Sequence, residues 1–304
     1  MLNNIKSKII LNIIFDKLKR QIKLKILKYN KFLQNRIYIN INDFQDFHLV
    51  KELNKKFNLN IQDDYVANIN LEYKKLGNEI LDYFNNIAFK KLKELNLSGN
   101  NLLDINKLGK VKLENLKILD LGGNQIKDIN ILEKVNFKEL KELYLHNNQI
   151  SNINILEKVK FEKLEILNLS NNNITNIDIF EKVNFIHLKK LNLFFNSISD
   201  ISSLLNAKFI KLKILCITQN NLNDRKNILE KLMVHFKNLR ILDSFEVKKN
   251  DDYFDFVYEN EHAFDNIPDI CCGHDIYDNH VFDNNYNFDN DHNFDNDYNF
   301  DNEE

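Results

Sequence analysis

Residues 140–150 read Leu-Lys-Glu-Leu-Tyr-Leu-His-Asn-Asn-Gln-Ile, and the apolar residues and the second asparagine of this phrase return every 24 residues. A fixed period of this length indicates a repeat architecture, in which each unit is one small structural element stacked on its neighbours. The first leucine of the phrase recurs without a slip at Leu92, Leu116, Leu140, Leu164, Leu188 and Leu212.

Each phrase predicts one short β-strand. Leu143 and Leu145 alternate with Tyr144, which is the two-residue period of a strand that buries one of its faces. We therefore expect both leucines to point into the core and Tyr144 to point out of it. The second half of the unit, with Ile153 and Leu156, predicts a short helix or 3₁₀ turn that closes the core from the opposite side. A single unit cannot bury its own apolar face, so the units must stack.

The asparagine that follows each strand is expected to serve the turn. Its side-chain amide offers two donors and one acceptor to backbone groups that no strand partner reaches. Stacked in successive units, these residues should form a ladder along the whole array. The ladder comprises Asn100, Asn124, Asn148, Asn172, Asn196 and Asn220.

The phrase L-x-x-L-x-L-x-x-N-x-L resembles that of the leucine-rich repeat family, over about residues 89–243. The resemblance implies an α/β solenoid of horseshoe shape with a parallel β-sheet on its concave face. A degenerate unit with Ile69 and Leu71 comes first and has Lys74 in place of the asparagine, as expected of a capping repeat. Residues 238–243 resemble the C-terminal cap of intracellular regulators of phosphatase-1.

Three segments are expected. Residues 1–60 form a helical N-terminal segment, residues 61–249 form the solenoid, and residues 250–304 form a low-complexity tail. The tail is expected to be disordered, because so polar a tract cannot bury enough surface to offset its ordering entropy. Charge also separates the ends: residues 1–36 carry ten Lys or Arg and one acid, whereas residues 251–304 carry seventeen acids and no Lys or Arg.

The basic N-terminal segment has several interpretations. Ile10, Ile14 and Leu18 have helical spacing and would suit a cap on the first repeat. Residues 5–37 also resemble a degenerate F-box, which docks a Skp1-type adaptor of a ubiquitin ligase, although the opening proline is absent and the segment is unusually basic. A basic amphipathic helix at an anionic membrane surface is a third interpretation. Nucleic-acid binding is disfavoured, because no known motif accompanies the basic residues.

No pattern of a catalytic site occurs in the sequence, which lacks a Gly-rich phosphate loop, G-x-S-x-G and H-E-x-x-H. We expect no enzyme activity, no cofactor and no small-molecule substrate. Cys271, Cys272, His274 and His280 lie close together, but adjacent cysteines lack the spacing that suits one tetrahedral ion, so no metal site is predicted. Three cysteines and no long apolar run favour an intracellular protein, cytoplasmic or nuclear.

Function is expected on the concave face, where outward strand positions line up in columns. Exposed aromatic residues on a rigid surface are typical of binding hot spots, although Phe195 could instead cover a turn. We expect a partner protein to contact Glu94, Asn96, Asp120, Glu142, Tyr144, His146, Asn168, Lys190, Asn192, Phe194 and Phe195. Two functions stay open: a scaffold or regulatory subunit, for instance of a phosphatase, and an F-box-type substrate adaptor of a ubiquitin ligase.

Overall fold

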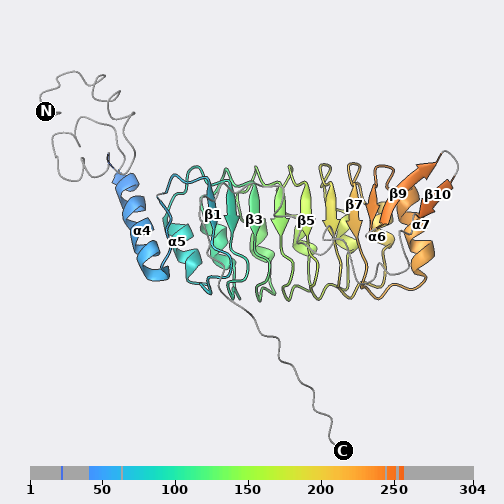
Figure 1. Cartoon of the computed structure of the whole chain (residues 1–304), viewed down its shortest axis with the longest axis horizontal. Helices are drawn as coiled ribbons and strands as arrows, with labels where there is room; N and C mark the ends of the chain where they lie inside the picture. The colour runs from blue at the N-terminus through green and yellow to red at the C-terminus, as the bar shows by residue number, and fades with distance from the viewer. Residues whose placement is uncertain (1–21, 23–40, 63, 244, 251–252, 257–304) are drawn as a thin grey trace, which may run out of the picture.

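The computed structural model describes residues 22, 41–62, 64–243, 245–250 and 253–256. Short strands lie side by side in chain order and form one continuous curved sheet (Figure 1). The parallel strands are β1 (Asn68–Asn70), β2 (Glu94–Asn96), β3 (Ile118–Asp120), β4 (Glu142–Tyr144), β5 (Ile166–Asn168), β6 (Lys190–Asn192), β7 (Ile214–Cys216) and β8 (Ile241–Leu242). The expected solenoid with a parallel sheet is confirmed.

Neighbouring strands pair in the register that the sequence period dictates. Leu119 lies opposite Leu95 on one side and opposite Leu143 on the other, so equivalent positions of successive repeats meet. No residue is gained or lost from β2 to β7, and each outward position therefore forms a straight column across the sheet.

Short helical turns cover the side opposite the strands. They are η2 (Asn106–Lys110), η3 (Asn130–Glu133), η4 (Asn154–Glu157), η5 (Asp178–Glu181) and the α-helical turn α6 (Ser202–Asn206). An Asp or Asn two residues before the first residue of each turn opens it. The carboxylate of Asp128 accepts the Asn130 N–H at 2.7 Å, and that of Asp200 accepts the Ser202 N–H at 2.8 Å. Such side chains favour turns because they satisfy a backbone donor locally.

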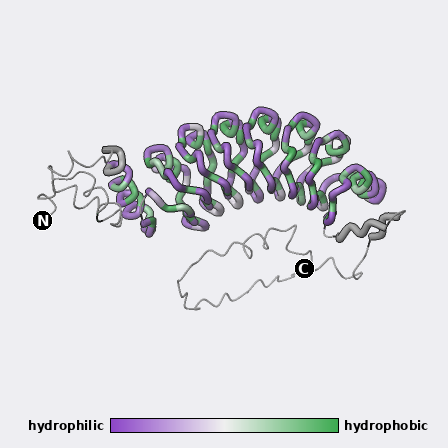
Figure 2. Tube along the Cα trace, turned by 90° about the horizontal axis from the view of Figure 1, so that it is seen from above, coloured by the Kyte–Doolittle hydropathy of each residue, from purple (hydrophilic) through white to green (hydrophobic). Residues whose placement is uncertain are grey.

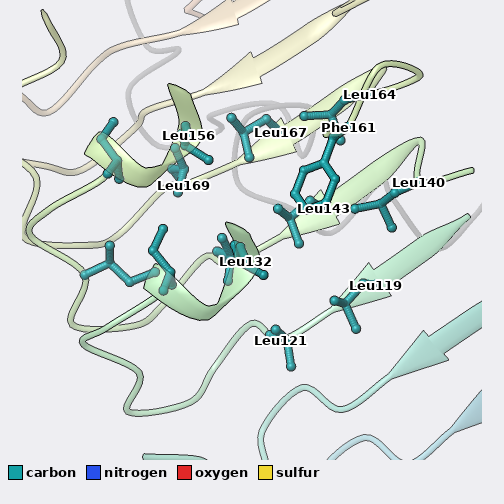
Figure 3. Close-up of a cluster of buried hydrophobic side chains, with 14 of the residues drawn as sticks. Leu119, Leu121, Leu132, Leu140, Leu143, Leu156, Phe161, Leu164, Leu167 and Leu169 are labelled. Carbon is teal, nitrogen blue, oxygen red and sulfur yellow. The ribbon is translucent and has the colours of Figure 1, made fainter. Parts of the chain in front are cut away.

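The core lies between the sheet and these turns. The two strand leucines of each repeat from β2 to β6 are at most 1% exposed, as are Leu132 and Leu156 from the turns. Figure 3 shows Leu119, Leu143 and Leu167 stacked in successive repeats, with Phe161 packed among them. Hydrophobic residues consequently follow the inner side of every coil, and hydrophilic residues the outer side (Figure 2).

Helices close both ends of the core. At the N-terminal end, α4 (Ile41–Phe57) contributes Val50 and Leu53, and α5 (Ile80–Asn86) packs between it and the strands (Figure 1). At the other end α7 (Arg225–His235) occupies the longer last unit and buries Leu232. Residues 5–37, which resemble an F-box, lie outside the described residues apart from Ile22.

Two antiparallel strands extend the sheet beyond β8. They are β9 (Phe245–Asn250) and β10 (Tyr253–Phe256). Strand β10 falls within residues 250–304, the predicted low-complexity tail. Alternating aromatic residues in Tyr-Phe-Asp-Phe favour a strand over a disordered tract.

The repeated asparagine joins each repeat to the one before it. The Asn148 side-chain oxygen accepts the N–H of Ile126 at 2.9 Å, and its nitrogen donates to the carbonyl of Leu121 at 3.0 Å. The same side chain donates to the carbonyl groups of Leu145 and His146 in its own repeat, both at 3.1 Å. Equivalent bonds to the preceding repeat are made by Asn100, Asn124, Asn172, Asn196 and Asn220.

We expect Asn148→Ala to lower the free energy of unfolding by roughly 3 kcal/mol, because it leaves buried backbone groups unpaired at about 1 to 3 kcal/mol each. Equilibrium urea unfolding followed by circular dichroism measures the change. The control is Gln149→Ala at the exposed neighbouring position, for which we expect a change below about 0.5 kcal/mol. Equal effects of the two substitutions would contradict a joining role for the asparagine.

Candidate functional site

Four polar residues expected to contact a partner instead close the ends of their strands. The side-chain oxygens of Asn96, Asp120, Asn168 and Asn192 each accept the backbone N–H two residues later, at 2.8 to 3.1 Å. All four are at most 6% exposed. The expectation that these side chains are open to a partner is therefore wrong, because the end of the strand uses them as hydrogen-bond acceptors.

Tyr144 takes the same column position but makes different contacts. Its hydroxyl group donates to the Glu142 carboxylate at 2.7 Å, and its ring meets the His146 ring edge-on at 6.5 Å between centroids. Only 3% of Tyr144 and 9% of Lys190 is exposed, so the expected exposure is wrong for both. Adjacent strands lie about 4.8 Å apart, so side chains in one column cover one another.

The His146 ring lies over a glycine of the preceding repeat. A methyl group added to Gly122 would sit 2.2 Å from the ring Cε1 atom, so only glycine leaves room for the ring at this position. Burial of the ring lowers the pKa of His146 below its ordinary value, and the negative charge of Asp120 opposes that shift to a lesser extent. Close to neutral pH the imidazole is therefore uncharged.

Phe194 and Phe195 form an aromatic pair where β6 ends. Their ring centroids are 6.1 Å apart with a 44° tilt. Phe195 is 54% exposed, whereas Phe194 is partly buried. Phe195 has a φ of +52°, in the left-handed region, where a bulky residue is a genuine outlier. The other regular repeats place Gly99, Gly123, Asn147, Asn171 and Gln219 there, also at positive φ, and the capping first unit places Tyr73 there at +53°.

Residues 90–206 match the family model of leucine-rich repeats in four overlapping windows, 90–134, 114–158, 138–182 and 162–206. The solenoid is a leucine-rich repeat array. Proteins with such repeats generally take part in protein–protein interaction.

Three solved structures are similar to this chain. An internalin (inlF) from Listeria monocytogenes is 29% identical over 53% of this chain and 43% of its own, with a TM-score of 0.44. Internalin C2 from the same organism is 26% identical over 66% of this chain and 93% of its own, with a TM-score of 0.48. A plant peptide hormone receptor in complex with RGF2 is 22% identical over 52% of this chain and 25% of its own, with a TM-score of 0.39. This chain thus spans less than half the length of the internalin inlF chain. No curated protein matches the sequence.

The concave face of the leucine-rich repeat array has two chemically different regions. The first region is acidic and contains Glu72, Glu94 and Glu142 from the units of β1, β2 and β4, together with the buried carboxylate of Asp120. Burial raises the pKa of Glu72, and the negative charge of Asp120 raises it further. The second region contains the aromatic pair, at the end of β6. The concave face therefore presents negative charge near its N-terminal end and apolar surface near β6.

The sequence analysis missed one column, the residue that immediately precedes each strand. We call it the basic ladder: Lys93, Lys117, Lys141, Glu165, Lys189, Lys213 and Arg240. Its signal was present in the sequence, since the lysines follow the same 24-residue period as the leucines. The columns predicted from that period comprised only residues within or just after the strands, and not the residue before each strand.

The described part of the chain holds no group of three or more His, Cys, Asp or Glu side chains placed to bind a metal ion. Cys271, Cys272, His274 and His280 lie outside it. Among the described helices, none is long and apolar enough to cross a membrane.

Acidification should destabilise the fold through His146. Because the pKa of His146 is lower in the folded protein than the ordinary value of 6.5, the unfolded chain binds the proton more readily as the pH falls. The free energy of unfolding is therefore full above pH 6.5 and decreases as the pH falls from there toward the pKa of the folded state. We expect His146→Gln to lose less stability than the wild type between about pH 7.5 and 5.5. Urea unfolding at both pH values tests this, with His48→Gln, at a side chain 74% exposed, as the control. A pH dependence unaltered by His146→Gln would refute the role of this histidine.

Phe195→Asn should stabilise the protein by about 1 kcal/mol, because it removes a bulky side chain from a left-handed conformation that asparagine adopts easily. The midpoint of urea unfolding measures the gain. Phe194→Asn is the matched control and should give no gain. A loss of stability in Phe195→Asn would mean that the ring packs on the turn, which is the alternative role for this residue.

Proposed function

We propose that this protein is a non-catalytic scaffold or regulatory subunit, and that it binds a partner protein through the concave face, centred on Phe194 and Phe195. The observation that carries the proposal is the conformation of Phe195. Its backbone is held at φ +52° while 54% of the residue faces solvent.

The fold gains little from phenylalanine at this position. Left-handed backbone costs a residue with a side chain about 1 to 2 kcal/mol, and an exposed ring recovers only part of that by burial. Asn147 and Asn171 serve the same turn in neighbouring repeats without this cost. Backbone strain that stability does not explain is a reason to propose function.

The face also indicates the chemistry of a partner. An apolar group would cover the aromatic pair, and a cationic group would meet the acidic region around Glu94 and Glu142. Strand β4 lies two strand spacings from β6, or about 10 Å. The favoured partner therefore presents an apolar and a basic side chain on one surface at about that separation.

The second candidate function, a ubiquitin-ligase substrate adaptor, uses the same face to recruit its substrate. It differs in requiring residues 1–40 for a Skp1-type contact. The packing of α4 residues Val50 and Leu53 into the solenoid core favours a capping role for residues 41–57, and it leaves the role of the preceding residues to the experiment.

The test is affinity purification with mass spectrometry, in which the full chain is compared with three variants. Phe195→Asn removes the exposed ring and keeps the turn. Leu103→Asn is the matched control, because Leu103 is 58% exposed and lies in a loop outside the aromatic pair. The third variant lacks residues 1–40. We expect a partner that binds the wild type and Leu103→Asn but not Phe195→Asn.

Calorimetry with the purified partner then measures affinity. We expect Phe195→Asn to raise the Kd at least tenfold, which corresponds to about 1.4 kcal/mol or more. A partner retained equally by Phe195→Asn would refute the assigned site. Skp1 and cullin subunits that disappear with residues 1–40 would select the adaptor function, and a phosphatase catalytic subunit that depends on Phe195 would select the regulatory one.

A further inference from the structure

The basic ladder is a continuous row of charge along the edge where the strands begin. The backbone fixes its spacing: the N–H of Lys117 donates to the carbonyl of Lys93 at 2.7 Å, and that of Arg240 donates to the carbonyl of Lys213 at 2.8 Å. Each rung therefore lies one strand spacing, about 4.8 Å, from the next. Lys93, Lys189, Lys213 and Arg240 are exposed, and Lys117 and Lys141 are partly buried.

A single acid interrupts the row. The Glu165 carboxylate bonds to Lys141 at 3.1 Å and also to Lys189. These two contacts lower the pKa of Glu165, the Lys189 hydrogen bond contributing most. The central acid thus stays charged and holds the two inner lysines.

In the described part of the chain the outer rungs have no close carboxylate, although the more distant Glu139 carboxylate attracts Lys117. Within the described residues, no carboxylate lies within ion-pair distance of Lys93, Lys117, Lys213 or Arg240. Like charges opposite one another on adjacent strands are destabilising. Two cationic pairs, Lys93 with Lys117 and Lys213 with Arg240, therefore flank the neutralised centre, and a polyanion would relieve both.

Acidic side chains follow a different column, where the helical turns begin. This column contains Asp104, Asp128, Asn152, Asn176, Asp200 and Asp224. Most of these side chains accept a backbone N–H of the turn that follows, as described above.

We propose that the basic ladder binds the acidic tail of the same chain, residues 257–304. This inference goes beyond the proposed function and does not depend on it. The tail carries fourteen Asp or Glu and no Lys or Arg, which complements the ladder in charge. The chain as a whole has a net charge of −2, so its basic surface is balanced within the molecule, whereas a nucleic-acid-binding protein usually keeps an excess of positive charge.

Length permits the contact. The ladder has six steps of about 4.8 Å, or about 29 Å in total, which roughly nine extended residues span. The tail has 48 residues from 257 to 304, and the chain leaves the solenoid at the end where Arg240 lies. Attachment to the same chain gives the tail a high effective concentration at the ladder, so weak contacts suffice.

The test uses zero-length carbodiimide coupling of the full chain, which joins lysine amines to carboxylates, followed by mass spectrometry. The ladder variant is Lys93→Glu with Lys117→Glu and Lys213→Glu. The matched control reverses three exposed lysines that follow the helical turns with the same period, Lys134→Glu, Lys158→Glu and Lys182→Glu. Small-angle scattering at about 20 mM and 500 mM salt measures the radius of gyration of each, since salt screens exposed charges.

We expect tail carboxylates to couple to ladder lysines in the wild type. Coupling of the tail to the two remaining ladder lysines, Lys141 and Lys189, should fall about tenfold in the ladder variant and stay unchanged in the control. The radius of gyration of the wild type should increase at high salt, and that of the ladder variant should already be larger than the wild-type value at low salt.

Three outcomes would overturn the proposal. The first is equal coupling of the tail to Lys134, Lys158 and Lys182. The second is coupling between different chains in a mixture of ¹⁵N-labelled and unlabelled protein, which would make the contact intermolecular. The third is ladder-dependent binding of a labelled single-stranded oligonucleotide without tail coupling, which would assign the ladder to nucleic acid.

Discussion

The buried side-chain amide that ends each strand is the constraint on which the rest of the structure depends. An array of three-residue strands offers few backbone hydrogen bonds per repeat, and the turn after each strand leaves others unpaired. Asn148 satisfies groups of its own repeat and of the preceding one with a single side chain. Because the amide spans the joint between repeats, it fixes their relative position, and the leucines can then meet in register.

Straight columns follow from that register, and both surface features depend on them. The aromatic pair is conspicuous because Phe195 occupies a column that is Gly, Asn or Gln in the other regular repeats, with Tyr73 only in the capping first unit. The basic ladder exists because the residue before each strand returns to the same edge in every repeat. In an irregular fold the same residues would scatter over the surface. The solenoid thus converts a sequence period into linear arrangements of charge and apolar surface.

Much of the fold could be predicted from the sequence, because one period determines both strand and core. The alternation of Leu143, Tyr144 and Leu145 correctly predicts which side chains point into the core. It does not predict how much of an outward side chain is exposed to solvent. Asn96 and Asp120 point out of the core and are buried all the same, since they accept backbone hydrogen bonds at the end of the strand. That use of a polar side chain depends on the turn geometry and is not visible in the pattern of apolar residues. The left-handed backbone at Phe195, in contrast, could have been inferred by comparing its column with Gly99 and Gly123.

The constant register has a consequence for how such a surface can change in size. The partners of Asn148 are Leu121 and Ile126, and those of Asn172 are their equivalents Leu145 and Ile150. One internal unit of 24 residues could therefore be lost or duplicated and every joint would still find matching groups on both sides. Such an event would move the aromatic pair relative to the acidic region by one strand spacing, about 4.8 Å, without a new fold. The number of whole repeats between the two regions therefore sets the distance between them.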